Sequence, residues 1–270
     1  MSPISQNARR RLRPFERAPR PLVGYAVDYA AGYETGWHQH PRAQLLHAIE
    51  GVLRVETEAA QFVLPPGTGL WMPARTLHVT RMPAGLRMRA LFLRADAARA
   101  GPGSVMVVAV SPLLRELILA ACEEPVAWDE RGPASHIAAL ALREIGRAAT
   151  GLLQVGALQV PACRDRRLRR VAEALLADPA DRRTLGAHAA AAGASERTLA
   201  RLFRRETGMT FQQWRRQVRL TEGLARLAQG ETPPRAAAAV GYASSPAFGA
   251  AYRAAFGTTP GRTRRARLVV

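Results

Sequence analysis

The feature that most constrains this chain occurs twice in its C-terminal third: an amphipathic helix, a short glycine turn and a second helix. In the first copy, the sequence predicts a helix over Thr184–Ala192 and another over Glu196–Thr207. Gly193 can adopt the positive φ that ends the first helix, and Ser195 can cap the second. This order is the helix-turn-helix pattern, in which the second helix enters the major groove of DNA.

The second helix of this copy separates apolar from basic positions. Leu199, Leu202 and Phe203 fall on the side that we expect to be buried. The outward side holds Arg197, Ala200, Arg201 and Arg204, with Arg205 beside them. A basic outward face on the second helix is suited to contact with DNA.

The second copy follows a longer predicted helix over Phe211–Gln229. A short helix over Arg235–Val240 begins at Pro233-Pro234, and a turn at Gly241–Ser244 leads into a helix over Ser245–Phe256. The outward positions of that last helix are Ser245, Pro246, Gly249, Ala250 and Arg253. Because only Arg253 is cationic, we expect base reading to depend mainly on the first copy. The second copy should contact the DNA backbone and respond to DNA shape.

The distribution of charge supports this interpretation. The net charge is +18, and all 39 basic residues are arginine. Residues 164–270 hold 21 arginines and eight acidic residues, whereas residues 21–163 are neutral overall. Cationic side chains displace counterions from the phosphate backbone, so a basic C-terminal third favours a nucleic acid partner over a merely solvated surface.

The stretches GASERTLARLFRRETGMTFQQWRRQVRL and VGYASSPAFGAAYRAAFGTTPGRTR resemble the AraC/XylS family of transcription regulators over residues 165–265. The resemblance implies a seven-helix domain with two recognition helices on promoter DNA, and RNA polymerase as a partner. It places Arg197, Ala200 and Arg201 towards bases, with Arg201 suited to guanine O6 and N7. Arg204 or Arg205 would contact phosphate.

The first part of the chain has a different pattern. Short apolar or alternating segments such as Leu45–Ile49, Val52–Thr57 and Met88–Leu93 predict strands of a small barrel or jelly roll. Helices are expected at Ser111–Cys122 and Ala134–Thr150. We therefore predict an α+β protein with a basic tail (1–20), a cupin-like β-barrel sensor (21–100), a helical hairpin for dimerisation and linkage (101–163), and an all-α double helix-turn-helix domain (164–270).

Two segments match cupin motifs in spacing: GYETGWHQHPRAQLLHAIEG and GTGLWMPARTLH. In metal-binding cupins the matching positions hold one divalent ion, and here they are His38, His40, Gln44 and His78. Imidazole suits Zn, Ni, Fe or Cu, but Gln44 replaces the usual Glu, and Arg75 replaces a glycine of the second motif. The histidines could instead be structural, with an effector bound directly beside Trp37 and Trp71.

These observations predict a cytoplasmic regulator, activator or repressor, that binds promoter DNA in response to a small-molecule effector or metal. Two cysteines and no apolar run of about 18 residues argue against a secreted or membrane protein. Apolar faces on the two middle helices make a homodimer possible, although packing on the barrel explains them equally well. A metal-dependent cupin enzyme of the dioxygenase type fused to a DNA-binding domain is the alternative, although we expect no enzyme activity. An architectural DNA binder without a ligand is a third possibility.

Overall fold

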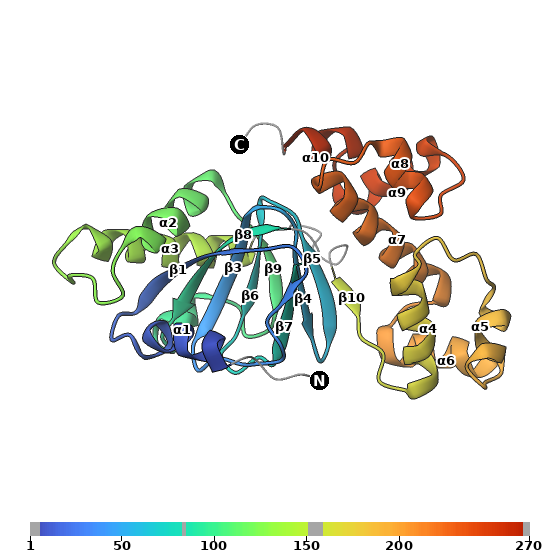
Figure 1. The fold of residues 1–270 in the computed structure, drawn as a ribbon, viewed down its shortest axis with the longest axis horizontal. Coiled ribbons are helices and arrows are strands. Elements are labelled where there is room, and N and C mark those ends of the chain that lie inside the picture. Colours follow the sequence, from blue (N-terminus) through green and yellow to red (C-terminus); the bar gives the residue numbers. More distant parts are fainter. Residues whose placement is uncertain (1–5, 83–84, 151–158, 267–270) are drawn as a thin grey trace. The chain divides into compact units, whose positions relative to one another are not determined.

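The computed structural model describes residues 6–82, 85–150 and 159–266 (Figure 1). The chain divides into two compact units, one formed by residues 1–57 and 64–155, the other by residues 58–63 and 156–270. Each unit is described by itself.

The first unit is built on two antiparallel sheets. One sheet has the order β1-β8-β3-β6-β9, and the other contains β4-β7-β2. The strands of the first sheet are β1 (Leu22–Tyr29), β8 (Leu86–Leu93), β3 (Ala43–Glu50), β6 (Thr68–Met72) and β9 (Met106–Ala109). Those of the second are β4 (Leu53–Thr57), β7 (His78–Met82) and β2 (Tyr33–Glu34). The predicted cupin-like fold is confirmed.

Two helices, α2 (Pro112–Glu123) and α3 (Pro133–Thr150), pack on the outer face of the first sheet (Figure 1). Ser111 caps α2 through Leu114 N–H, and Pro112 occupies its first turn, as the sequence predicts. A side chain at Gly24 of β1 would collide with the backbone at Ala121, so glycine permits α2 to lie close to the sheet.

Three features of this unit differ from the prediction. Residues Gln6–Arg17 form helix α1 and not a tail. Strand β9 lies beyond the expected end of the barrel at residue 100 and continues the first sheet, and a short 3-10 helix, η1 (Ala97–Ala100), precedes it. The expected region of dimerisation and linkage (101–163) falls partly outside the described residues, and its last part contains β10 (Gln159–Pro161), which pairs with β5 (Ala60–Leu64) in the C-terminal unit.

The second unit is helical, as expected. Its helices are α4 (Arg166–Ala177), α5 (Leu185–Ala191), α6 (Glu196–Thr207), α7 (Phe211–Ala228), α8 (Pro233–Ala239), α9 (Ser245–Phe256) and α10 (Pro260–Ala266). Helices α5 to α9 agree with the predicted ranges within a few residues. With α4 and α10 they make up the seven helices that the family resemblance implies, although no local pattern predicted α10. The indole of Trp214 on α7 is buried and donates to Pro161 O at 3.2 Å, which fixes α7 against β10. Among the described residues, no helix is long and apolar enough to cross a membrane.

Candidate functional site

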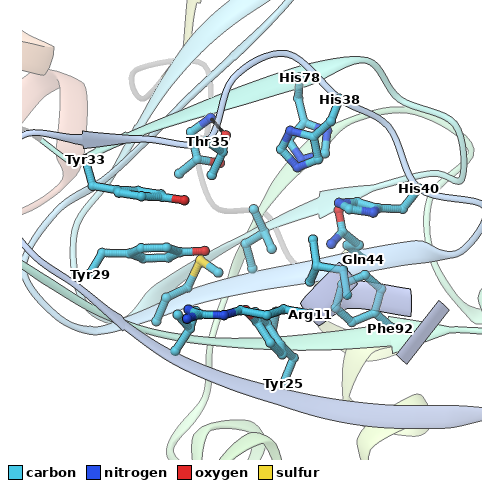
Figure 2. A pocket seen from close by; sticks show the side chains of 16 residues that line it. Arg11, Tyr25, Tyr29, Tyr33, Thr35, His38, His40, Gln44, His78 and Phe92 are labelled. Atoms are coloured by element: carbon cyan, nitrogen blue, oxygen red, sulfur yellow. Dashed lines mark hydrogen bonds between the residues drawn. The ribbon is translucent and has the colours of Figure 1, made fainter. Parts of the chain in front are cut away.

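A cavity of about 300 Å³ lies between the two sheets of the first unit (Figure 2). Its walls follow the alternation of the strands, because every second side chain of a strand points to the same face. The lining side chains are Tyr25, Val27 and Tyr29 of β1, Tyr33 of β2, Gln44 and Leu46 of β3, His78 and Thr80 of β7, Met88, Ala90 and Phe92 of β8, Arg11 and Leu12 of α1, and Thr35, His38 and His40.

Three histidines meet at one end of this cavity. His38 and His78 face each other in a short antiparallel bridge, with His38 N to His78 O at 2.9 Å. Their ring centroids are 4.3 Å apart, and His40 lies 4.8 Å from His38 and 5.5 Å from His78. One ring nitrogen of each histidine lies within 4.8 Å of the others, which is close enough to share one metal ion.

The tautomer of each ring is fixed by an acceptor on its Nδ1 atom. His38 Nδ1 lies 2.8 Å from Gly36 O, and His78 Nδ1 lies 2.9 Å from Thr76 O. His40 Nδ1 lies 2.7 Å from Oε1 of Glu16 on α1. A carbonyl or carboxylate oxygen only accepts, so each Nδ1 donates and each ring carries its lone pair on Nε2.

Burial keeps two of these rings neutral. Desolvation, with the His38 charge as a smaller cause, lowers the pKa of His40 to about 3, and the pKa of His78 falls to about 3 for the same reasons. Neutral imidazole is the form that binds a metal.

The other predicted residues of this domain separate into two groups. Gln44 is buried and lines the same cavity beside His40 (Figure 2). The two tryptophans, proposed as cavity walls, lie outside its lining. Trp71 pairs with Leu45, whose side chain faces away from the cavity, and donates Nε1–H to Pro102 O at 2.7 Å. Trp37 is half-buried.

The unusual residue of the second cupin-like motif is explained by its backbone. Arg75 has a φ of 62°, the left-handed conformation that glycine adopts most readily, and its N–H donates to His40 O at 2.7 Å. The structure thus retains the glycine-like turn that holds the histidine segment in place.

Sequence reasoning missed the contribution of α1 to the cavity. Arg11 and Leu12 line it, and Phe15 packs on Tyr25 with ring centroids 4.8 Å apart. The buried Arg42 donates to three carbonyls at the end of α1 and just after it, those of Glu16 (3.1 Å), Ala18 and Arg20 (3.0 Å). The alternation of Tyr25, Val27 and Tyr29 was a usable sequence signal for this wall, but no local pattern marks the docking of α1.

In the second unit, local signals position the first recognition helix. Gly193 has a φ of 69°, and Ser195 accepts from Thr198 N–H to cap α6. The apolar side of α6 is buried through Leu199, Leu202 and Phe203. The predicted DNA-facing arginines of this helix are all exposed: Arg197, Arg201, Arg204 and Arg205. Ala200 is half-buried on the same helix.

The second recognition helix, α9, is built in the same way. Gly241 has a φ of 75°, Ser244 caps the helix through Ala247 N–H, and Phe248 and Tyr252 are fully buried. The predicted contact positions are exposed or half-buried: Ser245, Pro246, Gly249, Ala250 and Arg253. Arg253 alone brings a positive charge to these five positions.

A basic groove beside α9 was not predicted. Arg216 of α7 is exposed and hydrogen-bonds with Tyr242, and both line a groove that also contains Ala250. Arg219 of the same groove has a structural role, since it donates to Pro179 O and Asp181 O. Helix α7 therefore supplies a cation beside α9, whose predicted contact positions carry only the charge of Arg253.

Comparisons with known families match both units. Residues 22–160 match the family model of the AraC-like ligand binding domain, and residues 188–266 match a helix-turn-helix domain.

Related proteins extend these matches over most of the chain. The HTH-type transcriptional regulator NimR of Escherichia coli is 30% identical over 225 residues, which cover 83% of this chain and 80% of NimR. Among solved structures, the transcriptional regulator of Chromobacterium violaceum with an AraC-type DNA-binding domain is 26% identical and covers 38% of this chain and 93% of its own, with a TM-score of 0.36. ToxT of Vibrio cholerae aligns with 90% of this chain and 97% of its own at 7% identity and a TM-score of 0.38, which is too low to support an argument.

Proposed function

The chain belongs to the AraC family of helix-turn-helix transcription regulators, and from that premise we propose that its ligand-binding domain holds a divalent transition metal on His38, His40 and His78. The rest of the cavity is the effector site beside the metal. Occupation of this site alters how the C-terminal domain binds promoter DNA.

The arrangement of the three Nδ1 atoms is the observation that carries the proposal. Histidine ligands of metals commonly donate their second ring nitrogen to a carbonyl or carboxylate, which fixes the tautomer and aims the other nitrogen at the ion. His38, His40 and His78 all donate in this way, and Glu16 provides the carboxylate for His40.

The donor set fits a borderline metal such as Zn, Ni, Fe or Cu, because all three groups are neutral imidazoles. A bound ion would supply coordination positions that an oxygen or nitrogen atom of an effector can occupy. Gln44 lines the cavity beside His40 and is a neutral, weaker ligand than the Glu usual at its position. This substitution favours a sensing role over the alternative of a dioxygenase-like enzyme, and turnover by metal-loaded protein would support that alternative instead.

On the DNA side, we propose that α6 reads bases, with Arg201 on guanine and Arg204 or Arg205 on phosphate. Helix α9 then contributes shape and backbone contacts through Ser245 and its neighbours. We further propose that the regulator acts in the cytoplasm, that it contacts RNA polymerase, as the family resemblance implies, and that the apolar faces of α2 and α3 allow it to form a homodimer.

Metal analysis of protein purified without a tag or chelator tests the proposal. The wild type should carry one transition metal ion per chain, or take one up after reloading. His38→Ala combined with His78→Ala should remove it while leaving DNA binding by the second unit intact. His136→Ala is the matched control, since His136 is exposed on α3 and lies outside the cluster. Wild-type protein that stays well below one ion per chain after reloading would overturn the proposal.

A further inference from the structure

We propose that the cavity binds a small organic anion with a planar aromatic part, and that the guanidinium of Arg11 on α1 pairs with its oxyanion. This inference rests on the proposed role of the cavity as the effector site, and it adds the chemical class of the effector.

The charge of the lining selects against cations. Of the sixteen lining residues, Arg11 is cationic and none is acidic. Glu16 is not among the lining residues, and it contacts the wall through Nδ1 of His40. A divalent ion on the three histidines would add further positive charge. An anion neutralises this excess, whereas a cation is repelled by it.

The walls supply aromatic surface and hydroxyl groups together. The rings of Tyr29 and Tyr33 are stacked, with centroids 5.0 Å apart and planes 20° apart, and both hydroxyls point into the cavity (Figure 2). Tyr25 lies on the same strand as Tyr29, shares a hydrogen bond with it, and packs edge-on against Phe92 at 6.1 Å. A planar ring can pack against these aromatic walls, and phenol hydroxyls can donate to an oxyanion.

Arg11 is held towards the cavity by the docking of α1. Phe15, one turn further along the helix, packs on Tyr25 and Phe92, and Arg42 fixes the carbonyls that follow. Burial raises the pKa of Tyr25, and the nearby charge of Arg11 opposes that rise. Within residues 6–82, 85–150 and 159–266, no carboxylate forms an ion pair with Arg11.

The size of the cavity limits the ligand. A volume of about 300 Å³ is at the lower end of small-molecule sites. One aromatic ring with a short acidic side group suits this volume, whereas a long lipid chain does not.

Three probes that share a ring and differ in charge test the proposal: phenylacetate, 2-phenylethanol and 2-phenylethylamine. Isothermal titration of the full-length protein, with its metal content measured on the same sample, should show that phenylacetate binds most tightly and the amine least. Arg11→Gln should weaken phenylacetate about tenfold, as expected for a charge-assisted pair near solvent, and leave 2-phenylethanol unchanged. Arg13→Gln is the control, because Arg13 is exposed on the same helix and does not line the cavity.

The outcomes separate the two proposals. Arg11-dependent binding of phenylacetate by protein that stays metal-free after reloading supports the anion site and contradicts the metal site. Three results in protein with stoichiometric metal would overturn the anion site alone. These are equal binding of the three probes, no phenylacetate binding at millimolar concentration, and the same loss of phenylacetate affinity in Arg13→Gln as in Arg11→Gln.

Discussion

Replacing Gly223 with alanine should fail to stabilise the second unit, although helix propensity alone predicts the opposite. Gly223 lies within α7, where glycine costs about 1 kcal/mol relative to alanine. The structure gives a reason for the glycine, because a methyl group there would lie 2.8 Å from Cε2 and 2.9 Å from Cζ of Phe248.

The expected change in stability follows from two opposing effects, the gain in helix propensity and the cost of overpacking. Phe248 is fully buried on α9, so its ring cannot rotate away without disturbing the core. Overpacking of this kind costs about 1–3 kcal/mol. The propensity gain of about 1 kcal/mol offsets part of it, so the net effect is between zero and about 2 kcal/mol of destabilisation.

Gly249→Ala provides the matched control, since Gly249 lies within α9 and a methyl group there meets no atom within 4 Å. That variant should gain about 1 kcal/mol. Amide hydrogen exchange on α7 and α9 in the full-length protein measures both changes locally. Combining Gly223→Ala with Phe248→Leu should recover part of the loss, because the shorter side chain leaves room for the methyl group.

The reasoning would be refuted if Gly223→Ala stabilised α7 and α9 as much as Gly249→Ala does. It would also be refuted if Phe248→Leu changed stability by the same amount in the wild type and in Gly223→Ala, since the effects of substitutions at contacting residues should not be additive.

Three further predictions concern the metal, DNA and assembly. Glu16→Gln should lower metal affinity about 10- to 100-fold, because a neutral amide replaces the carboxylate that orients the ring of His40. Competition with a chromogenic chelator measures this affinity, and an unchanged value would contradict the role of α1. Arg201→Ala should cost about 1–3 kcal/mol on the cognate site only, whereas Arg216→Ala should weaken cognate and random DNA equally and reduce the salt slope by about 1, both read by fluorescence anisotropy. Leu113→Glu with Leu140→Glu should give monomers in light scattering, because these exposed leucines of α2 and α3 are available to a second copy; a persistent dimer would place the interface elsewhere.

The DNA-binding unit was largely predictable because its signals are local. The Gly193 turn, the Ser195 cap and the buried face of α6 depend on residues within one or two helical turns of each other. The same applies to Ser244 and the bounds of α9. Helix α10 was missed because Gly257 and Pro260 indicate an end as readily as a new beginning.

The histidine site was predictable only in part. Spacing selected His38, His40 and His78 correctly as a group, and the structure brings them together. The prediction that Trp71 lines the cavity was wrong, because strand pairing rather than sequence separation decides which face of a sheet a side chain occupies. That residue packs under the Gly101–Pro102 segment instead.

By itself, therefore, the sequence determined the fold class, the two helix-turn-helix units and the identity of the three histidines. Tertiary structure alone decided that α1 is a helix docked on the barrel, that Glu16 orients His40, and that Arg11 enters the cavity. Turns, caps and periodicity act between neighbours along the chain, and a single sequence displays them. Contacts such as that of Glu16 with His40, 24 positions apart, arise from packing between segments that no local pattern relates.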